Sequence, residues 1–308
     1  MHALIVAVCA VLLDRLLGEP RRAHPLIGFG RLAAAMESRF NRASRPAWQQ
    51  RAHGIVAVLL LLAPLSVLPW FVVTSPVVGV LLEVCLLYLA LGGQSLAEHA
   101  QRVASALHAN DLDGARERVA LIVSRDTAAM QGSDVARATV ESVLENGNDA
   151  LFGALFWFAI AGVPGAILYR LANTLDAMWG YRTPRYRHFG WAAARLDDLL
   201  NLVPARLTAL TYALLGRTAR AWHCWRVQGR LWESPNAGPV MAAGAGARGV
   251  MLGGGAFYHG AWRERPALGE GAPATADDIE RALHLVRRGV YLWLGVWFAV
   301  VLGGKLLA

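Results

Sequence analysis

The sequence has almost no lysine, little charge and few cysteines. Of its 30 basic residues only Lys305 is a lysine, so the Walker A motif that cradles nucleotide phosphates, GxxxxGK[ST], is absent. Charged residues make up 17% of the 308 residues, whereas soluble domains average about a quarter. Cys9, Cys85 and Cys224 lie far apart, which excludes a CxxC zinc site and a disulfide framework. HExxH, a nucleophile elbow and a Ser-His-Asp order are also missing, so nothing supports a hydrolase.

The composition that remains is strongly apolar. Hydrophobic residues make up 56% of the chain, and they gather in runs of about the length that crosses a bilayer. We therefore predict an all-α, polytopic integral membrane protein, with a single membrane domain over residues 1–308, about four to six membrane-embedded helices and helical cytoplasmic loops. The predicted membrane segments are 1–17, 55–73, 77–93, 151–169, 202–215 and 289–305, with a turn at Thr74-Ser75-Pro76.

Two of these segments differ from ordinary spans. Gly162-Val163-Pro164-Gly165 interrupts 151–169, and 202–215 is too short to cross alone, so we expect re-entrant or intramembrane half-helices. The loops 18–54, 94–150 and 216–288 can then share one face. They are rich in arginine, which predicts the cytoplasmic side of the inner cell membrane. The net charge of +8 is spread over many loops, a pattern that does not suit nucleic acid.

A stripe of acids precedes the segment at 151–169. Glu141, Glu145 and Asp149 follow one another at four-residue spacing, which places them on one helix face. Arg137 stands four residues before Glu141 and is placed to pair with it. Such a stripe is commonly a solvated face. Because this one leads into a membrane-like run, a site for Mg²⁺ or an ammonium group is an equal alternative.

A second polar stretch runs from Asn173 to Arg206 between two apolar segments. Asn173 and Asp176 are three residues apart, and Asp197 and Asn201 are four apart, spacings that suit a metal-nucleotide site. The arginines of this stretch are placed either to bind phosphate or carboxylate or to lie at lipid headgroups, the role expected for Arg185 and Arg187.

Local signals predict further elements. Asp111-Leu112-Asp113-Gly114 opens a helix that runs towards Arg125, and Thr275 caps a final helix with early acids. The glycine-rich stretch 238–255 permits close backbone approach to a ligand. His24 beside Pro25 is by itself more typical of a structural residue than of a catalytic one.

Six motifs in order resemble the adenosylcobinamide-phosphate synthase family (CobD/CbiB) of cobalamin biosynthesis. They are D-R-L-L-G-E-P with H-P near the N-terminus, R-D-T at 125–127, E-S-x-x-E-N at 141–146, N-T-L-D-x-M-x-G-Y-R from 173, F-G-W-A-A-A-R-L-D-D-L-x-N-x-x-P-A-R ending at 206, and S-P-N-A-G at 234–238. The resemblance covers essentially the whole chain.

The resemblance implies an ATP-dependent ligase that uses Mg²⁺ and joins adenosylcobyric acid to (R)-1-amino-2-propanol O-phosphate. It implies catalytic roles, in holding Mg²⁺ or in orienting and deprotonating the amine, for Asp126, Glu141, Glu145, Asp176, Asp197 and Asp198. Within this set Glu141, Glu145 and Asp176 are the expected Mg²⁺ ligands. Substrate or phosphate contacts are implied for Asp14, His24, Arg125, Asn146, Asn173, Arg195, Arg206, Ser234 and Asn236. The expected partners are the two substrates, the lipid bilayer and other late membrane enzymes of the pathway, with no nucleic acid.

The chain also departs from the family pattern. Gly147 stands where many relatives have threonine, Ala150 where they have glycine, and Gly153-Ala154 where they have Ala-Pro; Pro239 follows the S-P-N-A-G motif directly. These changes bear on substrate preference, and the amine could also be ethanolamine phosphate or threonine phosphate. Two alternatives to the enzyme remain, a non-catalytic sensor or regulator of the AmpE type and a small-molecule transporter.

Overall fold

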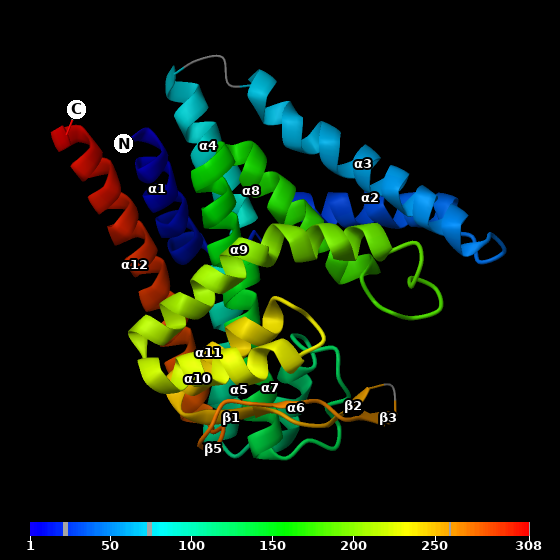
Figure 1. Cartoon of the computed structure of the whole chain (residues 1–308), viewed down its shortest axis with the longest axis vertical. Coiled ribbons are helices and arrows are strands. Elements are labelled where there is room, and N and C mark those ends of the chain that lie inside the picture. Colours follow the sequence, from blue (N-terminus) through cyan, green and yellow to red (C-terminus); the bar gives the residue numbers. More distant parts are fainter. Residues whose placement is uncertain (21–23, 73–75, 259, 308) are drawn as a thin grey trace. The chain divides into compact units, whose positions relative to one another are not determined.

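The computed structural model describes residues 1–20, 24–72, 76–258 and 260–307. Within these ranges the chain is helical apart from five short strands between residues 250 and 273 (Figure 1). It divides into two compact units, unit 1 with Met1–Gly92 and Gly153–Asn201, and unit 2 with Gly93–Phe152 and Leu202–Ala308. The helical membrane-protein class predicted from composition is confirmed. The single-domain expectation stays a prediction.

Unit 1 is built from long apolar helices. They are α1 (His2–Leu17), α2 (Pro25–Phe40), α3 (Ala47–Val72), α4 (Pro76–Ala90), α8 (Gly153–Trp179) and the first part of α9 (Trp191–Leu215). Polar contacts near both ends hold α1 against α4. His2 Nε2 lies 2.7 Å from Glu83 Oε2, and Tyr88 Oη donates to the carbonyl of Gly18, where α1 ends at a φ of 66°. The predicted turn at 74–75 lies outside the described residues.

The apolar segment 151–169 is interrupted as the sequence predicts. Gly162 has φ 64° and ψ −155° inside α8, and Pro164 begins the next helical stretch. Only glycine adopts this backbone conformation without strain. The break also brings two helical turns close together, because a Cβ on Gly165 would lie 2.5 Å from the carbonyl oxygen of Trp157.

The loop between α8 and α9 folds back onto unit 1. A Cβ on Gly190 would lie 1.8 Å from the Trp179 carbonyl oxygen, and one on Gly54 would lie 2.0 Å from that of Phe189. Arg185 in this loop contacts Glu37 of α2, with 2.7 Å between Arg185 Nη2 and Glu37 Oε1. An ion pair to the protein therefore engages one of the arginines expected at lipid headgroups.

Unit 2 surrounds helix α7 with shorter elements. They are α5 (Gly93–His108), α6 (Leu112–Val119), α7 (Gly132–Gly147), a π-helix η1 (Asn148–Phe152), the rest of α9, α10 (Thr218–Gln228), a 3₁₀ turn η2 (Gly229–Leu231), α11 (Ala237–Arg248) and α12 (Ala276–Leu307). Asp111 caps α6 by accepting from the Gly114 amide, but the helix ends at Val119 and does not continue to Arg125. Thr275 starts α12 as predicted, with its amide and hydroxyl donating to Asp278 Oδ2.

The glycine-rich stretch forms helix α11 rather than a ligand-binding loop. Every residue from Ala237 to Ala247 is buried. A Cβ on Gly244 would lie 2.6 Å from a methyl of Leu144 on α7, and one on Gly246 would lie 2.8 Å from the backbone of Ala221 on α10. The glycines therefore allow helices to approach closely. The prediction that they serve close approach to a ligand is wrong for these two positions.

Five short strands follow α11, and the sequence analysis did not predict them. They are β1 (Val250–Gly253), β2 (Ala256–Tyr258), β3 (Ala261–Arg263), β4 (Ala267–Leu268) and β5 (Ala272–Pro273). β1 pairs antiparallel with β4 and parallel with β5. β2 and β3 form a hairpin in which Phe257 faces Trp262 across the strands. With so few residues each, these strands carry no periodic pattern to detect.

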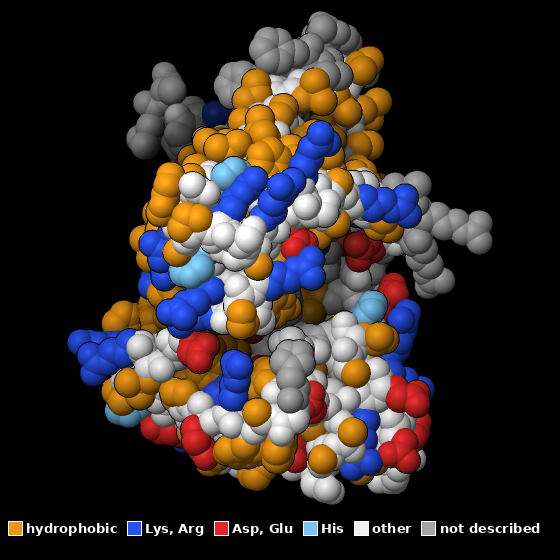
Figure 2. Space-filling model, turned by 90° about the vertical axis from the view of Figure 1, so that its right-hand side faces the viewer, with side chains coloured by type: hydrophobic (Ala, Val, Ile, Leu, Met, Phe, Trp, Pro, Cys, Tyr) orange, Lys and Arg blue, Asp and Glu red, His pale blue; other side chains and the backbone are white. Residues whose placement is uncertain are grey.

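Four helical stretches of the described chain have the length and composition to cross a membrane: Ala47–Leu68, Val78–His108, Gly132–Trp179 and Ala276–Leu306. They contain most of the predicted segments 55–73, 77–93, 151–169 and 289–305. The segment 1–17 forms the 16-residue helix α1, and 202–215 continues the longer helix α9 instead of standing alone. Exposed apolar side chains are common along α3, α4 and α12. Figure 2 shows a face of the molecule on which hydrophobic side chains cover a broad area.

Candidate functional site

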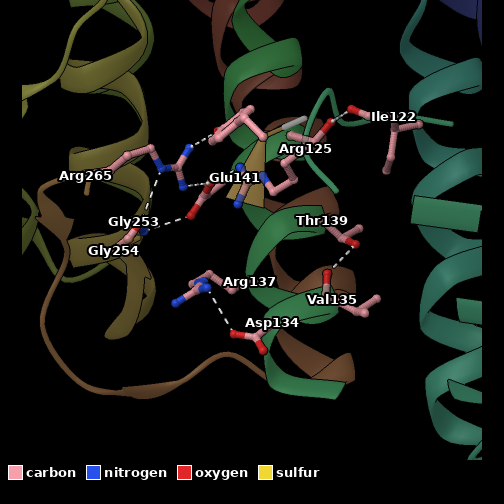
Figure 3. A network of polar contacts seen from close by, with 12 residues as sticks. Ile122, Arg125, Asp134, Val135, Arg137, Thr139, Glu141, Gly253, Gly254 and Arg265 are labelled. Carbon is pink, nitrogen blue, oxygen red and sulfur yellow. Dashed lines mark hydrogen bonds and ion pairs between the residues drawn. The ribbon is translucent and has the colours of Figure 1, made fainter. Parts of the chain in front are cut away.

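A cavity of about 300 Å³ lies within unit 2, between α7, the loop that precedes it and the segment 258–266. Its polar lining includes Ser124, Arg125, Glu141, Glu145, Asn146, Glu233, Tyr258, Arg263, Glu264 and Arg265. Two of the motifs from the sequence analysis, R-D-T at 125–127 and E-S-x-x-E-N at 141–146, therefore meet at one cavity. Figure 3 shows the polar contacts at its centre.

Glu141 is the anchor of this network. Its side chain is 2% exposed, and its carboxylate accepts from Arg125 Nη2 at 2.5 Å, Arg265 Nη2 at 3.1 Å and the Gly253 amide at 2.8 Å (Figure 3). A buried carboxylate needs compensation of this kind, since an unpaired buried charge is strongly destabilising. The pair predicted between Glu141 and Arg137 does not form, because Arg137 contacts Asp134 at 3.0 Å.

Arg265 closes one side of the cavity. Its guanidinium carbon lies 4.7 Å from the ring centre of Trp232. Its Nε donates to the Gly254 carbonyl and its Nη1 donates to Tyr258 Oη. Sequence reasoning missed Arg265, Trp232 and Tyr258, because none belongs to the motifs and their contacts with α7 are distant in the chain.

Arg125 presents an unused donor. Its side chain is 8% exposed, and its Nη1 is buried with no hydrogen-bond partner anywhere in the described part of the chain. Burial lowers the pKa of the Arg125 guanidinium, but the adjacent Glu141 carboxylate outweighs this effect and the net pKa is raised. The group is therefore a fixed cation with an unsatisfied N–H at the cavity.

Glu145 and Asn146 line the cavity one turn beyond Glu141. Asn146 Nδ2 donates to the carbonyl and the hydroxyl of Ser142. No hydrogen bond or ion pair engages Glu145 within the described ranges. Asp149 belongs to the π-helix η1. The four-residue spacing of the predicted acidic stripe therefore does not continue in α-helical geometry beyond Glu145.

Asp126 supports the β2–β3 hairpin beside the cavity. Its amide donates to the Phe257 carbonyl at 2.9 Å, and its carboxylate accepts from the Gly260 amide at 2.7 Å. The hairpin carries Tyr258 and Arg263, both of which line the cavity. Asp126 thus ties the motif at 125–127 to the strand segment that covers it.

The S-P-N-A-G motif caps α11 and reaches α9. Ser234 Oγ accepts from the amides of Asn236 and Ala237. Asn236 Oδ1 accepts from Arg206 Nη1, which also donates to the Leu202 carbonyl. Local structure accounts for these contacts of Ser234, Asn236 and Arg206, and their predicted substrate contacts stay predictions.

Unit 1 brings together a second set of predicted residues. Asp197 Oδ1 accepts from Asn173 Nδ2 at 3.2 Å and from Asn201 Nδ2 at 3.1 Å. Tyr169 Oη donates to Asn201 Oδ1 at 2.8 Å. Amide and carboxylate groups on α8 and α9 therefore form one hydrogen-bonded chain, as the spacing of the motifs predicts.

The remaining predicted residues of unit 1 lie around this chain of contacts. Asp14 is buried in α1, and the backbone carbonyl of Asp176 accepts from the Gly180 amide where α8 ends. Arg195 Nη1 donates to Asp198 Oδ2 at 3.1 Å. Burial raises the pKa of Asp198, although Arg195 and Arg182 oppose the shift.

His24 begins helix α2 in the same unit. Its Nδ1 accepts from the Leu26 amide at 3.1 Å, and the side chain is buried. Burial lowers the pKa of the imidazole; Glu19 raises it and Arg170 adds to the lowering, with a net decrease. A neutral, capping His24 agrees with the structural role that the residue suggests when taken alone.

The acids of the cavity differ in how well they suit Mg²⁺. No group of three or more His, Cys, Asp or Glu side chains is arranged to hold a metal among the residues that the structure describes. Glu141 is a poor candidate, because its oxygens already accept from two guanidinium groups and an amide. Glu145 fits better, since Mg²⁺ is commonly held by one or two carboxylates together with phosphate oxygens and water.

Comparison with known proteins gives one consistent result. A family described as "CobD/Cbib protein" matches residues 7–286. A protein of Chromobacterium violaceum is 58% identical over 305 residues, 98% of each chain. One of Stutzerimonas stutzeri is 60% identical over 304 residues, 99% of this chain and 98% of the relative. One of Mycobacterium tuberculosis H37Rv is 41% identical over 285 residues, 90% and 88% of the two chains. All three are named "Cobalamin biosynthesis protein CobD". No solved structure matches the chain significantly.

Proposed function

Because the chain belongs to the CobD/CbiB family of cobalamin biosynthesis, we propose that it converts adenosylcobyric acid to adenosylcobinamide phosphate. The reaction is an ATP-dependent amide formation with (R)-1-amino-2-propanol O-phosphate. One observation carries the proposal: the R-D-T and E-S-x-x-E-N motifs line the same cavity, with an unsatisfied guanidinium donor of Arg125 and an unpaired carboxylate of Glu145.

The chemistry requires activation of the corrinoid carboxylate. A carboxylate does not acylate an amine at a useful rate, so one of its oxygens must leave as part of a better leaving group. Transfer of the terminal phosphoryl group of ATP to that oxygen gives an acyl phosphate and ADP. The amine nitrogen then attacks the acyl carbon, the bond from that carbon to the phosphate oxygen breaks, and inorganic phosphate leaves. The nitrogen gives up one proton when the amide forms.

The residues of the cavity suit individual parts of this reaction. Arg125 would donate its remaining N–H to a phosphate oxygen and offset negative charge in the transition state. Glu145 would accept the proton of the attacking amine, because its carboxylate lines the same cavity without a counter-ion. Glu141 would act only on position, by fixing Arg125 and Arg265 through its three accepted hydrogen bonds.

ATP and Mg²⁺ are part of the proposal, with Glu145 as the residue of this cavity best suited to contact the metal. Bound Mg²⁺ would offset the charge of the nucleotide phosphates during phosphoryl transfer. The chain has no Walker A lysine, so arginine would have to take the corresponding contacts.

The site would work at the cytoplasmic face of the inner membrane, where ATP is available. The arginine-rich loops support this orientation under the positive-inside rule. Labelling of single cysteines at positions 125 and 185 tests it in intact cells and in cells opened by permeabilisation. Labelling of both positions only after permeabilisation is expected. Labelling of either one in intact cells would contradict the orientation.

Complementation tests the proposed reaction in the cell. The gene is expressed in a bacterium that lacks its own synthase, under conditions in which growth requires a cobamide made from cobyric acid. We expect growth without added cobinamide. Added cobinamide, which bypasses the step, is the control that shows the rest of the pathway to be intact. Growth only with cobinamide, despite good expression of the chain, would argue instead for a regulator or transporter.

A further inference from the structure

The cavity in unit 2 has two chemically different ends. It measures about 300 Å³, near the lower limit of the roughly 300–1,000 Å³ typical of small-molecule sites. A corrinoid with its many side chains is far too large for such a volume. The cavity therefore suits a small ligand, and its charged groups specify which kind.

The cationic end is formed by Arg125 and Arg265. The Arg125 side chain is more than nine-tenths buried and is fixed by Glu141, which engages Nη2 and leaves Nη1 without a partner in the described chain. A buried donor without an acceptor is costly, so a ligand that supplies an acceptor is favoured. Arg265 lines the same space. Two guanidinium groups match a phosphate group, because their planar donors fit its oxygens.

The anionic end is Glu145. It belongs to the same helix as Glu141, one turn further on, and lines the cavity without a hydrogen bond or ion pair among the described residues. The two guanidinium groups already share Glu141. A carboxylate in this position favours a cationic ligand group such as an ammonium.

Apolar side chains complete the wall. Val123, Ala138 and Met241 line the cavity together with the charged groups. They suit a short carbon chain between the two charged ends and offer contact for a methyl branch.

We propose that this cavity binds a small phosphorylated amine, with the phosphate at Arg125 and Arg265 and the ammonium at Glu145, independently of the corrinoid. The inference rests on the proposed function and adds which substrate the cavity holds and which residue recognises each end. Ethanolamine phosphate, which keeps both charges, also binds. Threonine phosphate binds more weakly, because its additional carboxylate lies next to the amine and is repelled by Glu145.

Isothermal titration calorimetry of the full-length chain in detergent tests the proposal. The probes are aminopropanol phosphate, inorganic phosphate and 1-amino-2-propanol, each without ATP or corrinoid. Glu145→Gln keeps the shape of the side chain and removes its charge. We expect it to weaken aminopropanol phosphate at least about tenfold, the effect of one charge-assisted contact, and to leave inorganic phosphate unchanged or bound more tightly. Arg125→Lys should weaken both phosphorylated probes.

Glu117→Gln is the matched control, since Glu117 is an exposed residue of α6 outside the cavity and its loss should change no affinity. Equal affinity of wild type and Glu145→Gln for aminopropanol phosphate overturns the proposal. Failure of the wild type to bind that probe, with or without a nonhydrolysable ATP analogue, overturns it as well. The two proposals fail separately: binding without amide formation refutes the reaction, and amide formation with unchanged binding by Glu145→Gln refutes this inference.

Discussion

Arg125 and Glu141 form a buried ion pair that joins the loop before α7 to the middle of that helix, with 2.5 Å between Nη2 and the carboxylate. The same carboxylate also accepts from Arg265. One acid therefore fixes two guanidinium groups that line the cavity, and the geometry of the proposed site depends on it.

Loss of the Glu141 charge should destabilise unit 2. Glu141→Gln leaves two buried guanidinium groups without their carboxylate, and breaking a buried pair in this way costs about 3–5 kcal/mol. Glu145→Gln, one turn away and unpaired, should cost less than about 1 kcal/mol. Thermal unfolding in detergent compares the two variants with the wild type. Equal losses for both would contradict the anchoring role of Glu141.

The break in α8 should depend on glycine at position 162. Its φ of 64° and ψ of −155° are open only to glycine, and a Cβ would meet no atom closer than 3.8 Å. Gly162→Ala therefore tests backbone strain alone, with an expected cost of about 1–3 kcal/mol. Gly295→Ala in α12, where a Cβ also meets nothing within 4 Å, should cause no loss. Similar unfolding temperatures for the two variants would argue against the break.

Gly147 should be coupled to Tyr212. A Cβ at position 147 would lie 2.6 Å from Tyr212 Oη and 2.9 Å from a Val286 methyl, so Gly147→Ala should cost about 1–3 kcal/mol through overpacking. In a Tyr212→Phe background the nearest atom is gone, and the same change should cost at least about 0.5 kcal/mol less. A double-mutant cycle of unfolding free energies measures the coupling; strict additivity would contradict it. Tyr212 thus accounts in packing terms for the departure from the family pattern at position 147.

His24 should make stability depend on pH. Its pKa is lowered in the folded state from the ordinary value of 6.5, mainly by burial, so the unfolded chain binds more protons as pH falls through 6.5. The contribution of His24 is therefore present above that pH and decreases below it. His24→Asn keeps a side-chain acceptor for the Leu26 amide and removes the titration. Between pH 7.5 and 5.5 its unfolding temperature should fall less than that of the wild type. A parallel fall in both proteins would assign the pH dependence to other groups.

Local patterns were sufficient to predict the helices and several of their ends. The long apolar runs, the break at Gly162 and the Thr275 cap depend on neighbouring residues only, and each is found in the structure. The six motifs also identified the residues that meet at the cavity from the loop at 125–127 and from α7.

Contacts distant in sequence could not be predicted in the same way. The four-residue spacing favoured Arg137 as the partner of Glu141, but Glu141 faces the core of unit 2 and is reached by Arg265 and Gly253, more than 100 residues away. No local pattern marks such partners. The glycines of α11 were misread for a related reason, because their role is to allow close packing against Leu144 and Ala221.

Amide formation by the purified chain tests the central claim most directly. Wild type and the Glu145→Gln and Glu117→Gln variants are incubated with adenosylcobyric acid, aminopropanol phosphate, ATP and Mg²⁺, and the product is identified by mass spectrometry. The account predicts adenosylcobinamide phosphate and an equal amount of ADP from wild type and Glu117→Gln, and a rate at least about a hundredfold lower from Glu145→Gln, as expected for a group that takes up the amine proton. Absence of product from well-folded wild type, or full activity of Glu145→Gln, would contradict it.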